Sequence, residues 1–172
     1  MDKVSRSIVC LSDLLALETD RIMEGEKYLI QTLPAWIHRV ASPKLQAILN
    51  KYLEYIRYHE QQMAGFFVNK SATPSTGRNR VIRALVEEAN EKLGLCADPE
   101  IYDACLLACV QEINHYKISV YGTVAAFFMA LGESRSASIF HKAEKDEKYI
   151  DEQLSFQADL DINELARTPV IK

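Results

Sequence analysis

The sequence has no apolar run that approaches the roughly 20 residues needed to cross a lipid bilayer, so we expect no membrane association. It also lacks the alternation of apolar and polar residues that is typical of a β-strand, over any useful length. It contains no fine repeat and no low-complexity tract. These absences exclude membrane-spanning, β-rich and repeat architectures and leave an all-α fold.

An excess of basic residues is missing as well. The chain has 20 lysines and arginines against 24 aspartates and glutamates, a formal net charge of -4, so it has no electrostatic footprint for nucleic acid. The N-terminal segment carries a short apolar patch that meets Asp13 before it reaches the length of a signal-peptide core. We therefore expect no nucleic-acid partner, no signal peptide and a cytoplasmic protein.

The four cysteines form no C-x-x-C pair. Cys10 and Cys96 stand apart, whereas Cys105 and Cys109 lie one helical turn from each other among alanines and leucines. A zinc site or a disulfide framework would be expected to show a paired spacing. We interpret these residues as small buried thiols.

The dominant positive feature is helical periodicity. With 172 residues the chain is long enough for one domain (1–172), which we expect to have a bundle core at about 11–158 and a short C-terminal tail. Apolar residues at three- and four-residue spacings predict five helices, at about 11–40, 43–68, 80–94, 99–131 and 134–158. Ser12 or Asp13, Ser42 and Asp98 are the predicted N-caps, and Gly132 ends the fourth helix. Four long helices with a short crossover helix between the second and third predict a ferritin-like four-helix bundle.

Three charged residues occupy positions where these helices should place apolar ones: Glu26, Lys117 and Glu147. Glu26 lies about as far before the turn at Ser42 as His59 lies after it. Lys117 and Glu147 are equally far from Gly132, so all of these side chains should share one layer of the bundle. Burying an unpaired charge is prohibitive, which means that the charges pair with one another or bind a metal.

We consider three interpretations of this layer. In the first, Lys117 forms a buried network with Glu26 and Glu147, and no cofactor is expected. The neighbours that could complete its hydrogen bonds are His59, Tyr121, Arg57 and Asn114. In the second, the Lys117 ammonium extends to solvent along the helix seam. In the third, a metal such as iron or another divalent transition metal is bound by a reduced set, Glu26, His59 and Glu147, because ferritin-like proteins hold paired metals at this height.

Several segments carry a resemblance to a known family. These are LSDLLALETDRIMEGEKYLIQTLPAWIHRVASPKL, RALVEEANE, DPEIYDACLLACVQEINHYKISVYGTVAAFFMALG and KDEKYIDEQL. Together they resemble the YciE/YciF-type ferritin-like stress proteins of bacteria, in order, over most of the chain. The resemblance implies a ferritin-like bundle with a crossover helix, a homodimer and a link to stress responses.

The chain departs from the pattern of that family at acidic positions. Asn114 and Lys117 stand where the family pattern E-H-Y-E has glutamates, and Arg83 stands where A-M-E-G has one. Tyr55 replaces a carboxylate or amide on the second helix. Two acidic positions have become basic and two neutral, as expected if protein charge replaces metal charge.

Three functional hypotheses follow. The first is a non-catalytic, stress-associated protein whose metal layer has become a salt-bridge network. The second is an iron-handling or oxidising protein that uses Glu26, His59, Glu147 and Glu144. The third is an interaction module whose dimer face, on the first two helices, contains Tyr52, Tyr55, Tyr58 and the Phe66–Phe67 pair. Aromatic residues at helical spacing are more often core than interface, and Tyr52 and Phe66 also lie on the inward line of the second helix.

Overall fold

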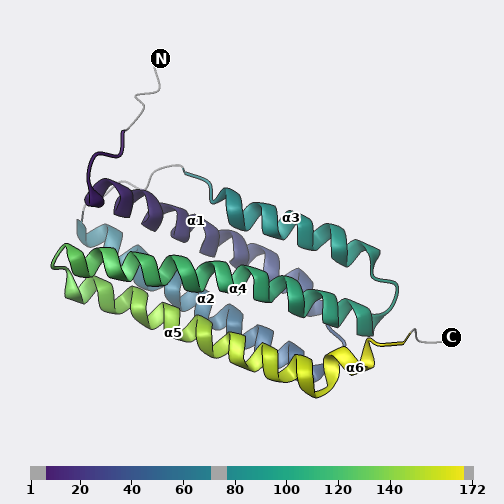
Figure 1. Cartoon of the computed structure of the whole chain (residues 1–172). Coiled ribbons are helices and arrows are strands. Elements are labelled where there is room, and N and C mark those ends of the chain that lie inside the picture. The colour runs from purple at the N-terminus through teal and green to yellow at the C-terminus, as the bar shows by residue number, and fades with distance from the viewer. Residues whose placement is uncertain (1–6, 71–76, 169–172) are drawn as a thin grey trace, which may run out of the picture.

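The computed structural model describes residues 7–70 and 77–168, without the side chains of residues 66–70. Over these residues every regular element is helical, which confirms the all-α prediction (Figure 1). The elements are α1 (Leu11–His38), α2 (Pro43–Lys70), α3 (Arg80–Leu95), α4 (Pro99–Ala130), α5 (Ser134–Gln157), the π-helical turn η1 (Ala158–Ile162) and α6 (Asn163–Leu165). No helix in this described part is long and apolar enough to span a membrane.

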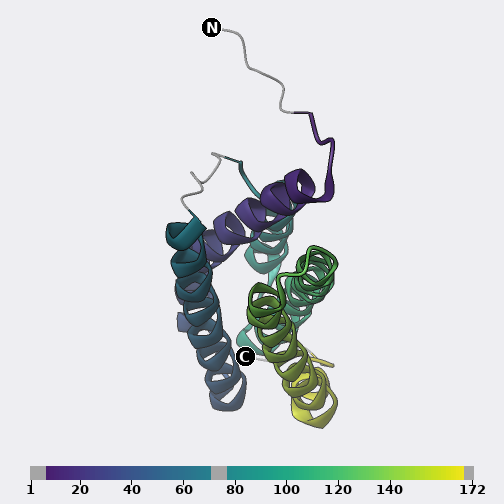
Figure 2. The same ribbon diagram turned by 90° about the vertical axis from the view of Figure 1, so that its left-hand side faces the viewer.

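The four long helices form two antiparallel hairpins, α1–α2 and α4–α5, that pack against each other. Helix α1 contacts α4 and helix α2 contacts α5, so the four enclose a common core (Figure 2). Helix α3 lies outside this bundle, against α4 and α1 (Figure 1). The predicted ferritin-like arrangement with a crossover helix is therefore confirmed.

The helix ends follow the predicted signals in most places. The Ser42 hydroxyl accepts a hydrogen bond from Leu45 N at 3.3 Å, and the Asp98 carboxylate accepts one from Ile101 N at 3.0 Å. Each of these side chains satisfies a backbone donor that the first helical turn leaves unpaired. After α4, Gly132 adopts a φ of 76°, a left-handed conformation that glycine tolerates best.

The predicted start of the first helix at about Leu11 is confirmed, but its predicted N-cap was wrong. Cys10 is the N-cap of α1, in place of Ser12 or Asp13. Asp13 occupies the third helical position, where its carboxylate accepts hydrogen bonds from Val9 N at 3.1 Å and Cys10 N at 3.2 Å. The acidic side chain therefore still stabilises the helix start, but from inside the first turn.

The cysteine prediction was correct only in part. Cys109 is buried, Cys96 and Cys105 are partly exposed, and Cys10 is exposed. Cys10 is exposed because it caps α1 ahead of the first turn that packs on the bundle.

Close contact between α1 and α3 depends on Gly25. A Cβ atom at this position would lie 2.5 Å from Ile82 Cδ1 and 3.0 Å from Asn79 Nδ2, so a larger residue would require these side chains to shift. Next to it, Glu24 accepts a hydrogen bond from Asn79 N at 2.6 Å and pairs with Arg83. The close approach at Gly25 and the hydrogen bond and ion pair of Glu24 therefore help to hold the crossover helix against α1.

A single buried carboxylate holds the turn between α1 and α2 to the start of α4. Asp103 is 3% exposed and accepts hydrogen bonds from Ala41 N at 3.1 Å and Ser42 N at 2.7 Å. Burial raises the pKa of Asp103, and the two backbone donors oppose this rise. The contact fixes the height at which the first hairpin meets the second.

We expect Asp103→Ala to lower the free energy of unfolding by about 2–3 kcal/mol, because two backbone N–H groups lose their acceptor. Urea unfolding followed by circular dichroism measures this change. Glu112→Ala, at an exposed site on the same helix, is the matched control and should change stability by less than about 0.5 kcal/mol. Equal effects of the two variants would show that Asp103 does not hold the turn.

Candidate functional site

A layer of polar side chains crosses the middle of the bundle and divides its apolar interior into two clusters. On one side lie buried residues such as Leu29, Ile56 and Ile113, and on the other lie Ile22 and Val124. All four long helices contribute to the layer. Its buried members are Glu26 from α1, Tyr52 and His59 from α2, Asn114, Lys117 and Tyr121 from α4, and Asp146 and Glu147 from α5.

Lys117 lies at the centre of this layer and is 3% exposed. Its ammonium nitrogen is 2.9 Å from Glu26 Oε1 and 2.7 Å from Glu147 Oε1. The same nitrogen donates a hydrogen bond of 3.4 Å to the Tyr52 hydroxyl and lies 4.8 Å from the centre of the Tyr52 ring. One cation therefore bridges carboxylates that belong to opposite hairpins, α1–α2 and α4–α5.

Neutral donors add hydrogen bonds to the two carboxylates. Asn114 Nδ2 donates to Glu147 Oε2 at 2.7 Å and to the Glu147 carbonyl at 3.0 Å. The Tyr121 hydroxyl donates to Glu26 Oε1 at 2.6 Å. Hydrogen bonds to charged acceptors are stronger than those between neutral groups, so these contacts offset part of the cost of burying the two anions.

His59 forms the edge of the layer that faces α5. Its Nε2 lies 3.3 Å from Asp146 Oδ2, and its Nδ1 lies 3.7 Å from Glu147 Oε1. Asp146 also pairs with Lys142 at the surface. A chain of polar contacts therefore runs from buried Glu147 through His59 and Asp146 to exposed Lys142.

The charges of the layer follow from burial and proximity. Burial lowers the pKa of His59 and nearby Lys117 adds to this, so the imidazole is neutral at pH 7. Burial also acts to lower the pKa of Lys117, but the carboxylates of Glu147 and Glu26 outweigh it and raise that pKa overall. Lys117 is therefore charged.

Two carboxylates, Glu26 and Glu147, contact this one ammonium, so these three groups together carry one excess negative charge when both carboxylates are ionised. Burial raises the pKa of Glu147 from 4.5 to about 7, although Lys117 opposes the rise. Burial, together with the facing carboxylates, raises the pKa of Tyr52 and of Tyr121 well above 10. Both phenols therefore remain protonated and act as donors.

The residues of this layer do not fit a paired metal centre. Such a centre takes a carboxylate from each of two helices and a Glu-x-x-His pair from each of the other two. Here Glu26, His59 and Glu147 offer ligand atoms within 4.8 Å of one another, but α4 offers an amide and an ammonium. The Lys117 ammonium contacts the same carboxylate oxygens that a metal would use, and a cation there repels a second cation.

Three buried atoms of the layer do offer unused acceptor capacity. Glu26 Oε2, Asn114 Oδ1 and His59 Nδ1 have no hydrogen-bond partner among the described residues. Unpaired buried polar atoms are uncommon and point to water or an ion. They are the feature that keeps a single-metal interpretation under consideration.

The structure brings together all but one of the residues that the sequence assigned to the layer: Glu26, His59, Asn114, Lys117, Tyr121 and Glu147. The exception is Arg57, which is exposed. It adds Asp146, which the sequence analysis missed. Asp146 lies three residues after Ala143 on the buried line of α5, so the helical spacing could have revealed it.

The structure decides between the two interpretations of Tyr52. It is 1% exposed and contacts Lys117, so its predicted position on the inward line of the second helix is confirmed and it forms no part of a dimer face. Tyr58 is exposed and Tyr55 is half-buried. The side chains of Phe66 and Phe67 lie outside the described residues.

Glu144, a further candidate ligand, lies outside the layer and pairs with Lys148 and His141.

Comparison with known proteins gives the chain its family. Residues 11–167 match the family DUF892, which is described as a domain of unknown function. The chain belongs to this family. The chain is also similar to Protein YciF of Escherichia coli (strain K12), with 28% identity over 143 residues, or 83% of this chain and 86% of that protein.

Solved structures show the same fold. YcfI of Rhodopseudomonas palustris, which is described as a proposed structural protein, has a TM-score of 0.83 at 28% identity and covers 88% of this chain and 96% of its own. The E. coli stress protein YciF has a TM-score of 0.84 at 24% identity and covers 91% of this chain and 99% of its own. The resemblance to YciF-type proteins is therefore confirmed.

We expect Lys117→Met to lower the free energy of unfolding by roughly 3–5 kcal/mol at pH 8, because it leaves two buried carboxylates without a countercharge. The loss should shrink toward pH 5, where the carboxylates take up protons and no longer need a countercharge. Urea unfolding at both pH values tests this. Lys92→Met, at a partly exposed lysine that pairs with Glu88 at 2.8 Å, is the control and should cost less than about 1 kcal/mol at either pH. A similarly small cost for Lys117→Met would contradict the network.

The raised pKa of Glu147 should make the free energy of unfolding depend on pH differently in wild type and in Glu147→Gln. Between its ordinary pKa of 4.5 and its native value of about 7, the folded chain holds a proton that the unfolded chain has released. Wild-type stability therefore falls through this window, by roughly 3 kcal/mol from this group, and the glutamine variant lacks that fall. The stability of the variant relative to wild type should rise from pH 5 to pH 8 in urea unfolding. A constant difference would mean that Glu147 ionises normally.

Proposed function

We propose that this protein is a non-catalytic, stress-associated member of its family, in which a protein cation replaces the metal centre of a ferritin-like bundle. One observation carries the proposal. The Lys117 ammonium is within 3 Å of carboxylate oxygens from two helices, at the mid-height of the bundle. The relatives named as a stress protein and as a proposed structural protein support a role of this kind.

The chemistry of the donors supports the absence of catalysis. Oxidation of iron and activation of oxygen need bridging carboxylates and open coordination positions. Here both carboxylates are engaged by Lys117, and donors from Asn114 and Tyr121 take up further lone pairs. The hydrogen bonds and ion pairs of the layer instead connect the four long helices.

A second candidate function rests on one specific observation. Glu26, His59 and Glu147 could bind a single divalent transition metal, because their ligand atoms lie within 4.8 Å of one another. The protein would then handle iron or a similar ion with a reduced set of ligands. This requires Lys117 to lose its proton or to leave the layer.

Metal content and thermal stability distinguish the two functions. The wild-type chain should purify without stoichiometric iron, manganese or zinc, and its Tm should not respond to those ions. Lys117→Glu combined with Asn114→Glu removes the cation and adds carboxylates. Ferrous iron at a hundredfold excess over its Kd should then raise Tm by about 5–10 °C, because an ion that binds only the native state stabilises it by mass action.

The control adds His59→Ala to the double variant, which removes a ligand and should reduce the rise in Tm. Elemental analysis accompanies each melting curve. One tightly held ion per wild-type chain, lost on Glu26→Gln and on Glu147→Gln, would establish the second function and overturn the first.

We also propose that the protein is a homodimer, as its resemblance to YciF-type proteins implies. Tyr149 and Phe156 support a surface that includes α5, because they are large, apolar and 47% and 65% exposed. Light scattering at micromolar concentration should give twice the mass of one chain, and Phe156→Glu should give a monomer. A wild-type monomer under these conditions would refute the proposal.

A further inference from the structure

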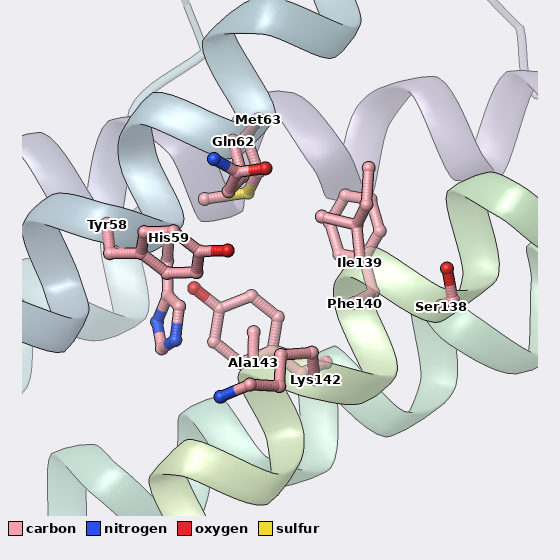
Figure 3. A pocket seen from close by; sticks show the side chains of 10 residues that line it. Tyr58, His59, Gln62, Met63, Ser138, Ile139, Phe140, Lys142 and Ala143 are labelled. Carbon is pink, nitrogen blue, oxygen red and sulfur yellow. The ribbon is translucent and has the colours of Figure 1, made fainter.

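The polar layer is flanked by two different spaces. Between α2 and α5, beside His59, a pocket of about 200 Å³ opens to the surface (Figure 3). The described residues that line it include no carboxylate, and Lys142 at its mouth already pairs with Asp146. On the opposite side of the bundle, where α3 packs against α4 and α1, the layer borders a cavity of about 10 Å³. This second space is about the size of a single water molecule.

The walls of the small cavity come from three helices. Helix α1 contributes Ile22 and Glu26, α3 contributes Ile82 and its N-cap Asn79, and α4 contributes Tyr116, Lys117, Val120 and Tyr121. Tyr116 and Val120 are partly exposed, whereas each of the other wall residues is at most 5% exposed. The cavity is therefore almost sealed from bulk solvent.

Glu26 has one carboxylate oxygen that the protein leaves unsatisfied. Its Oε1 lies 2.9 Å from the Lys117 ammonium and accepts a hydrogen bond from the Tyr121 hydroxyl at 2.6 Å. Its Oε2 is buried and has no hydrogen-bond partner among the described residues. Leaving a charged acceptor buried and unpaired is costly, so a hydrogen-bond donor is expected beside this oxygen.

Two further polar side chains in the wall can bind the molecule that supplies this donor. The Asn79 amide donates one of its two hydrogens to the Arg21 carbonyl at 3.0 Å, which leaves the second available. The Tyr116 hydroxyl donates to Asn79 Oδ1 at 3.4 Å, and its oxygen can still accept a hydrogen bond. With Glu26 Oε2, these groups supply the roughly three hydrogen bonds that a buried water makes.

Size and charge decide which molecule fits. A volume of about 10 Å³ is close to the minimum for one water molecule and is too small for an organic ligand. A metal ion in the cavity would be repelled by the Lys117 ammonium in its wall, and an anion would be repelled by Glu26. A neutral molecule that both donates and accepts hydrogen bonds meets these conditions, and water is the smallest one.

We propose that one water molecule occupies this cavity, donates a hydrogen bond to Glu26 Oε2 and links the polar layer to the start of α3. The other contacts of α3 with α1 include those at Gly25 and Glu24, which lie outside the layer. The water therefore joins the crossover helix to the hydrogen-bond network of the four long helices. Because the walls are almost sealed, this water exchanges slowly with bulk solvent.

A high-resolution crystal structure and magnetic relaxation dispersion of the water oxygen in solution test the proposal. The crystal should show one water in the cavity, within hydrogen-bond distance of Glu26 Oε2. Relaxation dispersion counts waters that stay bound for longer than the protein takes to tumble. Val120→Ile should hold one such water fewer than wild type, because the added methyl group fills the cavity. An empty cavity, a metal ion in it, or Glu26 Oε2 bonded to a protein donor would overturn the proposal.

Val81→Ile is the matched control, because it adds the same methyl group at a 46% exposed site on α3 that is outside the cavity. It should keep the water count of wild type, and an equal loss of water in both variants would contradict the assignment to this cavity. Should Val120→Ile fail to fold, the density and the water count of the wild-type protein decide.

The link to α3 has a readout of its own in amide hydrogen exchange. In Val120→Ile the amides of the second turn of α3 should exchange about fivefold faster than in wild type, the factor to which one lost hydrogen bond corresponds. In Val81→Ile they should keep the wild-type rate. An unchanged rate in Val120→Ile would show that the water does not hold α3 to the layer.

Discussion

The arrangement of the bundle depends on one cation placed between two anions in its interior. Lys117 on α4 contacts Glu26 on α1, Glu147 on α5 and the Tyr52 hydroxyl on α2, so a single ammonium joins all four long helices. In water this pairing would be weak, but in a layer that is almost fully buried each unpaired charge would cost several kcal/mol. The alignment in which these groups meet is therefore strongly favoured.

This constraint explains why the polar layer is tolerated at all. Apolar residues in its place would be equally or more stable, since a buried ion pair rarely exceeds the stabilisation of well-packed hydrophobic groups. Both clusters are made of apolar side chains, so a helix shifted by one turn would still bury apolar surface against apolar surface. Such a shift would move Lys117 into an apolar cluster. The layer therefore fixes the register of helices whose apolar faces alone would permit several.

The sequence predicts the fold well because helical spacing and helix caps are local signals. The five helices, the signals at Ser42, Asp98 and Gly132, and the inward positions of Glu26, Lys117 and Glu147 could all be read from it. The role of Tyr52 could not, because a tyrosine on an inward line is compatible with an apolar core, a dimer face or a polar layer. Its hydroxyl has a partner only because Lys117 arrives from another helix. The pocket beside the layer depends on how far apart α2 and α5 lie, which no local pattern encodes.

The position of Lys117 also determines what a single mutation would do to the layer. Lysine and glutamate codons differ at a single base, so the ammonium at the centre of the layer is one point mutation away from a carboxylate. That step changes the charge of a closed space by two units, and proton uptake by the carboxylates or a captured cation is needed to neutralise the difference. The same mutation is therefore more destabilising at high pH and in the absence of a bound cation than at low pH or with one.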